Sequence, residues 1–176
     1  MGPVTIRSFE DKVPKIAPTA WVSEAAYVVG DVEIGEDSSI WPGAVVRGDF
    51  GSIRIGENTV IEDTCIVHCA GEMVIGDHNI IGHAVTVHGA AIGSNCLIGN
   101  GTILLDDSRI GDLCMVAAGS LVRARTVVPD RSFVVGSPAR IEPLGDGRVG
   151  ALEAFERRDW EYSYAALAKR YRAAGL

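Results

Sequence analysis

Residues 92–127 consist of six consecutive hexapeptides, IGSNCL, IGNGTI, LLDDSR, IGDLCM, VAAGSL and VRARTV, and each begins with Ile, Leu or Val. The same period continues through most of the chain with three changes of phase. The aliphatic positions are Val22, Val28, Ile34, Ile40, Val46, Ile55, Ile61, Val67, Ile75, Ile81, Val87, Ile92, Ile98, Leu104, Ile110, Val116, Val122 and Val128. A period of six over more than a hundred residues indicates a repeat architecture and does not fit a two-sheet sandwich.

The residue four places after each aliphatic is mostly small (Ala, Ser, Thr or Cys), and Gly often follows the aliphatic directly. One inward aliphatic and one small inward residue per hexapeptide predict a triangular parallel β-helix, with three short strands in each coil of about 18 residues. We expect this mainly β domain over residues 1–148, with its hexapeptides over about 22–133. From residue 149 to 176 the apolar residues recur at helical spacing, which predicts a C-terminal helix packed on the β-helix. They are Leu152, Phe155, Trp160, Tyr164, Leu167 and Tyr171.

Composition and charge limit the classes of binding partner and the cellular compartment that we expect for this protein. The chain has 176 residues, a length typical of one domain, and 47% of them are hydrophobic although only 6% are aromatic. Sixteen Lys and Arg residues against 23 Asp and Glu residues give a net charge of −7, which argues against nucleic acid and anionic membranes as partners. No apolar segment resembles an export signal or a membrane span, and the four Cys are expected to be reduced thiols. We therefore expect a cytoplasmic protein.

Two histidines occupy the same position on successive coils of the expected β-helix. His68 directly follows Val67 and His88 directly follows Val87, so both side chains are expected to point outward from one face. His83 lies on the preceding face, and a metal bound by all three histidines would need His83 from a neighbouring subunit. A three-fold trimer would supply three equal sites. Three neutral imidazoles with one open position are the ligand set of a hydrolytic or hydrating zinc site; the alternative is three surface histidines without a metal.

Charged residues are expected around these histidines. Arg47 lies one coil before His68, and Asp63 lies one coil before His83, so we expect Arg47 and Asp63 to form an ion pair between subunits. Glu62 neighbours the same site. Its carboxylate could accept a hydrogen bond from metal-bound water or orient a histidine ligand, and the alternative is a plain interface carboxylate.

Four segments on this repeat resemble the gamma-class carbonic anhydrases: RGDFGSI at 47–53, IEDTCIVH at 61–68, GHAVTVHG at 82–89 and GSPAR at 136–140. The hexapeptides and GSPAR are shared with acyltransferases, whereas the Arg-Gly-Asp loop and the spacing of the three histidines are more specific. The resemblance covers about residues 10–172. It implies a left-handed β-helix and a homotrimer, with Zn²⁺, or Fe²⁺ or Co²⁺ in some members, at each interface.

The resemblance also implies roles for individual residues. His68 and His88 of one chain and His83 of the next would be the metal ligands. Tyr164 resembles a C-terminal-helix tyrosine that reaches the metal site in bacterial and archaeal homologues. The residues that match the family's interface and site-shaping positions are Arg47, Asp49 and Asp63.

The chain departs from the family pattern at two places. The family usually has Gln at the position of Glu62. The prototype also carries a long acidic loop with a glutamate proton shuttle, whereas the segment between His68 and Ile75 is short here and offers only Glu72.

Three functional hypotheses follow. The first is a metal-dependent carbonic anhydrase for CO₂ and bicarbonate, in which metal-bound hydroxide attacks CO₂ and Glu62 or Glu72 helps pass the proton to solvent. The second is a CoA-linked enzyme on the same fold, either an acyl-CoA thioesterase that uses the metal-bound water or an acyltransferase that uses a histidine as base. The third is a non-catalytic trimeric binding module that keeps the metal for structure.

Overall fold

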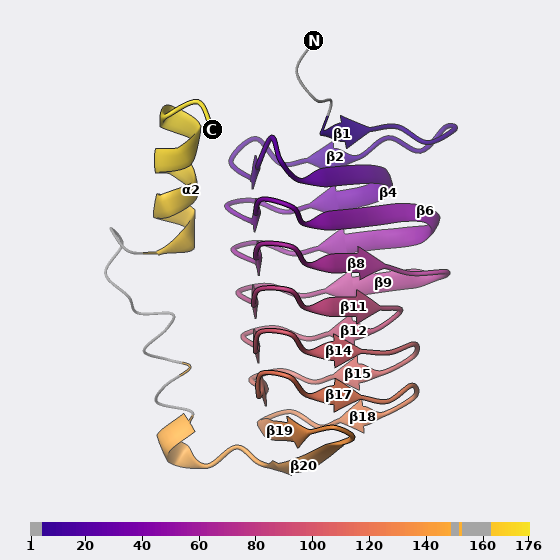
Figure 1. The fold of residues 1–176 in the computed structure, drawn as a ribbon, viewed down its shortest axis with the longest axis vertical. Helices are drawn as coiled ribbons and strands as arrows, with labels where there is room; N and C mark the ends of the chain where they lie inside the picture. The colour runs from indigo at the N-terminus through magenta and orange to yellow at the C-terminus, as the bar shows by residue number, and fades with distance from the viewer. Residues whose placement is uncertain (1–4, 149–151, 153–162) are drawn as a thin grey trace.

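The computed structural model describes residues 5–148, Leu152 and residues 163–176. It is a parallel β-solenoid of about seven turns, with a helix at its C-terminal end (Figure 1). The coils are stacked along one axis, and the C-terminal helix lies beside the coils nearest the N-terminus. This arrangement confirms the predicted parallel β-helix of hexapeptide repeats.

Two of the three faces of the solenoid merge into one 12-stranded sheet, because the long strands β4 and β6 continue around the corner between them. The strands of this sheet are β1 (Ile6–Arg7), β2 (Lys15–Ile16), β4 (Tyr27–Ile34), β6 (Val45–Ile55), β8 (Ile66–His68), β9 (Glu72–Ile75), β11 (Thr86–His88), β12 (Ala91–Ile92), β14 (Ile103–Leu104), β15 (Arg109–Ile110), β17 (Leu121–Val122) and β18 (Val127–Val128). We call the face formed by β8, β11, β14, β17 and the first halves of β4 and β6 the histidine face. The face formed by β2, β9, β12, β15, β18 and the second halves of β4 and β6 is the charged face.

The third face is a separate 8-stranded sheet, and because it carries the C-terminal helix we call it the helix face. Its strands are β3 (Trp21–Val22), β5 (Ser39–Ile40), β7 (Val60–Ile61), β10 (Ile80–Ile81), β13 (Leu97–Ile98), β16 (Met115–Val116), β19 (Ser132–Gly136) and β20 (Ala139–Pro143). The last pair, β19 and β20, is antiparallel, so this hairpin ends the parallel stack.

The predicted inward positions stack in register from coil to coil. Val46 pairs with Val67, and Val67 pairs with Val87; the other two faces repeat this pattern. Seventeen of the eighteen predicted aliphatic residues are buried, with at most 3% of their surface exposed. Val22 is only partly buried, because β3 is the edge strand of the helix face and has no coil beyond it.

The helix α2 (Tyr164–Ala173) packs on the helix face through aromatic rings. Trp21 and Trp41 are both 5% exposed, and Tyr171 contacts both indole rings edge-on. The predicted C-terminal helix is thus present. Of the residues expected earlier in this helix, Leu152 is buried, whereas Phe155 and Trp160 lie outside the described residues. In the part of the chain that the structure describes, no helix is long and apolar enough to cross a bilayer.

Glycine follows many inward aliphatics because the next coil lies directly against that position. A Cβ atom at Gly99 would lie 2.5 Å from the backbone nitrogen of Ala118 and 2.8 Å from the carbonyl oxygen of Val116. Both contacts are with backbone, which cannot move without opening the stack.

The substitution Gly99→Ala is therefore expected to lower the free energy of unfolding by about 1–3 kcal/mol, measured by urea denaturation at fixed protein concentration. Gly71→Ala is the matched control, because a Cβ atom there would meet no heavy atom within 4 Å. Equal midpoints for the two variants would contradict the close approach of the coils at Gly99.

Candidate metal centre

His68 and His88 meet at one corner of the solenoid, where β8 and β11 end. The two strands pair in register, with His68 opposite His88, as the repeat predicts. The Nδ1 atom of His68 lies 3.4 Å from the Nε2 atom of His88. The preceding residues, Val67 and Val87, are completely buried, so alternation along the strands directs both imidazoles outward.

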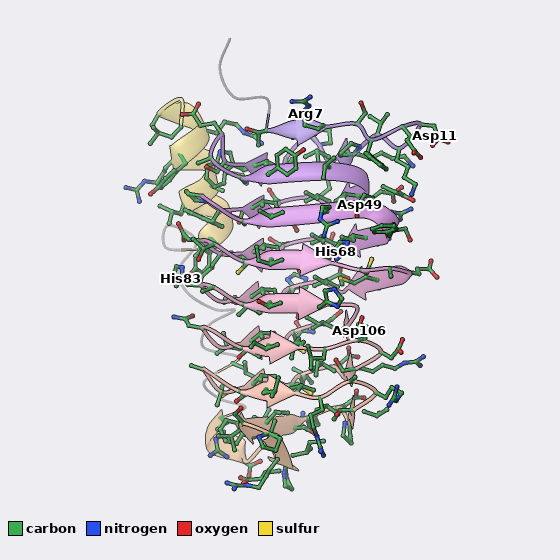
Figure 2. The ribbon with its side chains drawn as sticks, turned by 45° about the vertical axis from the view of Figure 1, so that its right-hand side comes forward. Arg7, Asp11, Asp49, His68, His83 and Asp106 are labelled. Carbon is green, nitrogen blue, oxygen red and sulfur yellow. The ribbon has the colours of Figure 1, made fainter. Side chains whose placement is uncertain are left out.

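A carboxylate holds the outer nitrogen of each imidazole. Asp49 Oδ1 lies 3.1 Å from His68 Nε2, and Asp106 Oδ1 lies 3.0 Å from His88 Nδ1. Asp49, His68 and Asp106 follow one another along the same edge in Figure 2. Where a carboxylate accepts the N–H of a neutral imidazole, the other nitrogen of that ring carries a lone pair and can bind a metal ion.

The spacing of the two inner nitrogens fits a metal ion. Tetrahedral Zn²⁺ binds histidine nitrogens at about 2.0–2.1 Å, which places two such ligands about 3.3–3.4 Å apart. Carboxylates on the outer nitrogens are the usual partners of histidines that bind metals. The two inner nitrogens at this corner therefore have a spacing that suits a zinc-class cation.

Asp49 connects this corner to Arg47. Arg47 is opposite His68 in the β6–β8 pairing, and its guanidinium forms an ion pair with Asp49. Burial disfavours the charged carboxylate of Asp49, but hydrogen bonds from Arg47 and from the Phe50 amide outweigh it and keep the pKa of Asp49 below its usual value. Asp49 is thus a charged partner for His68.

His83 lies at the other corner of the histidine face, after β10. Figure 2 shows it at the opposite edge from His68 and Asp106. Its side chain is 52% exposed, with Nε2 3.3 Å from Glu62 and Nδ1 3.1 Å from Asp63. Within the described residues no group of three His, Cys, Asp or Glu side chains could hold a metal ion.

Glu62 links His83 to the C-terminal helix. Its side chain is 5% exposed, and the hydroxyl of Tyr164 on α2 donates a hydrogen bond to Glu62 Oε1. The ring of Tyr164 packs edge-on against Trp41 on the helix face. The helix therefore brings Tyr164 to a buried carboxylate in contact with His83.

The structure thus gathers the expected residues into two groups at two corners. Glu72 joins neither group: it is exposed on β9 of the charged face, opposite Ser52. In the described structure no hydrogen bond or ion pair connects Glu72 to His68, His83 or His88. The expected ion pair between Arg47 and Asp63 of different subunits stays a prediction, and within the chain Asp63 contacts His83.

Asp106 is the site residue that sequence reasoning missed. It could have been found from the stacking register, because Val87 pairs with Leu104 and the two residues after Leu104 therefore lie beside His88. The four cysteines are buried and unbridged. Burial raises the pKa of the Cys65 thiol to about 12 and also raises that of Cys69, so both behave as core side chains.

Comparison with known proteins finds relatives among the hexapeptide-repeat proteins and the gamma carbonic anhydrases. The family model of the bacterial transferase hexapeptide (six repeats) matches residues 89–124. Gamma carbonic anhydrase 1, mitochondrial, from Arabidopsis thaliana is 40% identical over 157 residues, which cover 84% of this chain and 57% of the relative. The carnitine operon protein CaiE from Escherichia coli K12 is 36% identical over 135 residues, which cover 76% of this chain and 69% of that protein.

A solved structure extends the match to nearly the whole fold. The hexapeptide transferase family protein from Anaplasma phagocytophilum is 32% identical, with a TM-score of 0.87, and the match covers 95% of this chain and 98% of that one. The chain spans only 57% and 52% of the length of the two Arabidopsis relatives, gamma carbonic anhydrases 1 and 2.

The contact between Tyr164 and Glu62 can be tested by Tyr164→Phe, which keeps the ring and removes the donor. We expect the free energy of unfolding to fall by about 1–3 kcal/mol, because a buried carboxylate loses a hydrogen bond. Tyr171→Phe is the control, since the side chain of Tyr171 makes ring contacts and no hydrogen bond in the described structure. Urea unfolding followed by tryptophan fluorescence measures both variants, and equal losses would contradict the role of the hydroxyl.

Proposed function

Because the chain belongs to the gamma-class carbonic anhydrase family of hexapeptide-repeat proteins, we propose that it is a metal-dependent carbonic anhydrase. It interconverts CO₂ and bicarbonate at sites shared between neighbouring subunits of a homotrimer. The observation that carries this proposal is the pair His68 and His88, whose inner nitrogens lie 3.4 Å apart while carboxylates hold the outer ones.

His68 and His88 of one chain and His83 of the next would hold the cation, Zn²⁺ or, as in some family members, Fe²⁺ or Co²⁺. When bound, such a cation lowers the pKa of coordinated water toward neutrality and so supplies a nucleophile for CO₂. Asp49 keeps the imidazole of His68 in a fixed orientation, with Arg47 neutralising its charge. Three histidine ligands would leave room for a water molecule on the cation.

Glu62 is the residue best placed to take up the proton that hydration releases. Its Oε2 atom lies 3.3 Å from His83, and its Oε1 atom accepts from Tyr164, which fixes the direction of the carboxylate. A buried carboxylate that contacts both a proposed ligand, His83, and the C-terminal helix can pass a proton toward solvent. Glu72 lies on the charged face, away from this route.

An outward-facing ladder on the histidine face supports the trimer. Its residues stack in register from β4 to β17, and all but one are apolar. They are Tyr27, Val45, Ile66, Thr86, Ile103 and Leu121. The ladder runs between the corner of His68 and His88 and the corner of His83. In a three-fold assembly that brings these corners together, the ladder would be buried between the chains.

Mixed trimers test the shared site. His68→Ala and His83→Ala are each expected to reduce CO₂ hydration to the buffer rate in stopped-flow assays of zinc-loaded protein. Unfolding and refolding the two variants together should restore about a quarter of wild-type activity. This follows because three in four random trimers contain both kinds of chain, and each mixed trimer has one complete site in three.

Two results would contradict different parts of the proposal, namely the shared site and the catalytic activity. A mixture no more active than the separate variants would rule out a site shared between chains. A zinc-loaded wild-type protein with no hydration above buffer would rule out carbonic anhydrase activity itself and leave a metal-binding module.

A second candidate is acyl transfer from CoA. It is favoured by the match to the bacterial transferase hexapeptide model and by the similarity to the Anaplasma hexapeptide transferase family protein. On this fold His88, held by Asp106, would act as a general base. Acyl transfer by metal-free protein, together with absent CO₂ hydration, would support this function over the first.

The ladder predicts how assembly responds to charge. Ile103→Glu is expected to convert trimers to monomers in size-exclusion chromatography with light scattering, because it would bury an unpaired carboxylate between chains. Val127→Glu introduces the same charge on the charged face, where Val127 is 65% exposed, and should leave the trimer intact. Dissociation by both variants, or by neither, would contradict the histidine face as the interface.

A further inference from the structure

We propose that Asp106 is a positioning residue for the metal site: it fixes the imidazole of His88 with its proton on Nδ1 and its lone pair on Nε2. This proposal rests on the proposed function, because only the proposed metal centre provides a cation for the lone pair of His88 to bind. Asp106 then determines which nitrogen of His88 can act as a ligand.

The side chain of Asp106 is directed at His88. Asp106 lies in the turn after β14, one coil beyond His88, and its Oδ1 atom is 3.0 Å from His88 Nδ1. In the described structure this is the one hydrogen bond of its side chain. The backbone of the turn is held separately, since the carbonyl of Asp106 accepts from the Arg125 amide and Asp107 donates to the carbonyl of Gly89. The carboxylate is therefore not needed to hold the turn.

Gly89 leaves the space that this carboxylate occupies. A Cβ atom at Gly89 would lie 2.7 Å from Asp106 Oδ1, and the φ angle of Gly89 is +64°. The amide of Gly89 donates to the carbonyl of His68, so the glycine also joins the two histidine coils. A side chain at position 89 would displace the carboxylate from His88, and glycine is the residue that avoids this contact.

Asp106 differs from Asp49, which performs the same task for His68. Asp49 shares its charge with Arg47, whereas no ion pair among the described residues joins Asp106 to a Lys or Arg. A carboxylate on the outer nitrogen of His88 strengthens the imidazole as an electron donor. The contacts run from Asp49 to His68, from His68 to His88 and from His88 to Asp106, so one carboxylate lies at each end of the histidine pair.

Three variants of the full-length protein test this role. Asp106→Ala removes the acceptor. Asp106→Asn keeps a neutral acceptor in the same place. Asp107→Asn removes the same charge from the neighbouring residue, whose φ of +60° asparagine tolerates well. Circular dichroism and oligomer mass establish that each variant folds and assembles like the wild type.

The first measurement is the tautomer of His88 in metal-free protein, from long-range ¹H–¹⁵N NMR correlations of labelled histidine. Wild type, Asp106→Asn and Asp107→Asn should show the proton on Nδ1, whereas Asp106→Ala should lose this preference. The second is zinc affinity by competition with a chelating dye. It should fall about 10- to 100-fold in Asp106→Ala, less in Asp106→Asn, and not at all in Asp107→Asn.

The outcomes separate this proposal from the proposed function. If the wild type binds zinc and Asp106→Ala binds it equally well, or keeps the proton of His88 on Nδ1, the positioning role is wrong and the metal site stands. A wild-type protein that binds no zinc would overturn both.

Discussion

In-register hydrogen bonding between successive coils is the interaction on which the rest of the molecule depends. Strands stack at about 4.8 Å, so a residue lies directly beside the residue in the same position of the next coil. This places His68 beside His88 and Arg47 beside His68. A slip of one residue would turn both imidazoles into the core and the buried valines outward. The relative positions of Arg47, His68 and His88 are therefore fixed by the hydrogen-bonded register of the strands.

The repeat is broken where the chemistry lies. All three changes in the phase of the hexapeptides fall at the corner between the histidine face and the charged face, after Val46, Val67 and Val87. At every other corner the inward aliphatic residues are six positions apart. At this corner the chain varies in length and so presents Asp49 and both histidines, as expected when a fold departs from its local rules at a functional site.

The hexapeptide period alone predicts much of the fold and part of the candidate site. The inward residues, the pairing of the two histidines and the separation of His83 all follow from counting positions. The contact of Tyr164 with Glu62 does not, because it joins residues 102 apart in different elements, and its geometry depends on the packing of α2 on the two tryptophans. Glu72 is close to His68 in sequence, but the strand after the corner carries it to the charged face.

In the proposed trimer, the division of the site between two corners would couple metal binding to assembly. One chain would supply two imidazoles, those of His68 and His88, whose inner nitrogens lie 3.4 Å apart. The third imidazole lies at the far corner, where Glu62 and Asp63 contact its nitrogens. In the proposed trimer a metal that binds three ligands binds the assembly more tightly than the single chain. By linkage it must then stabilise the assembly by the same free energy, so trimer stability depends on metal concentration.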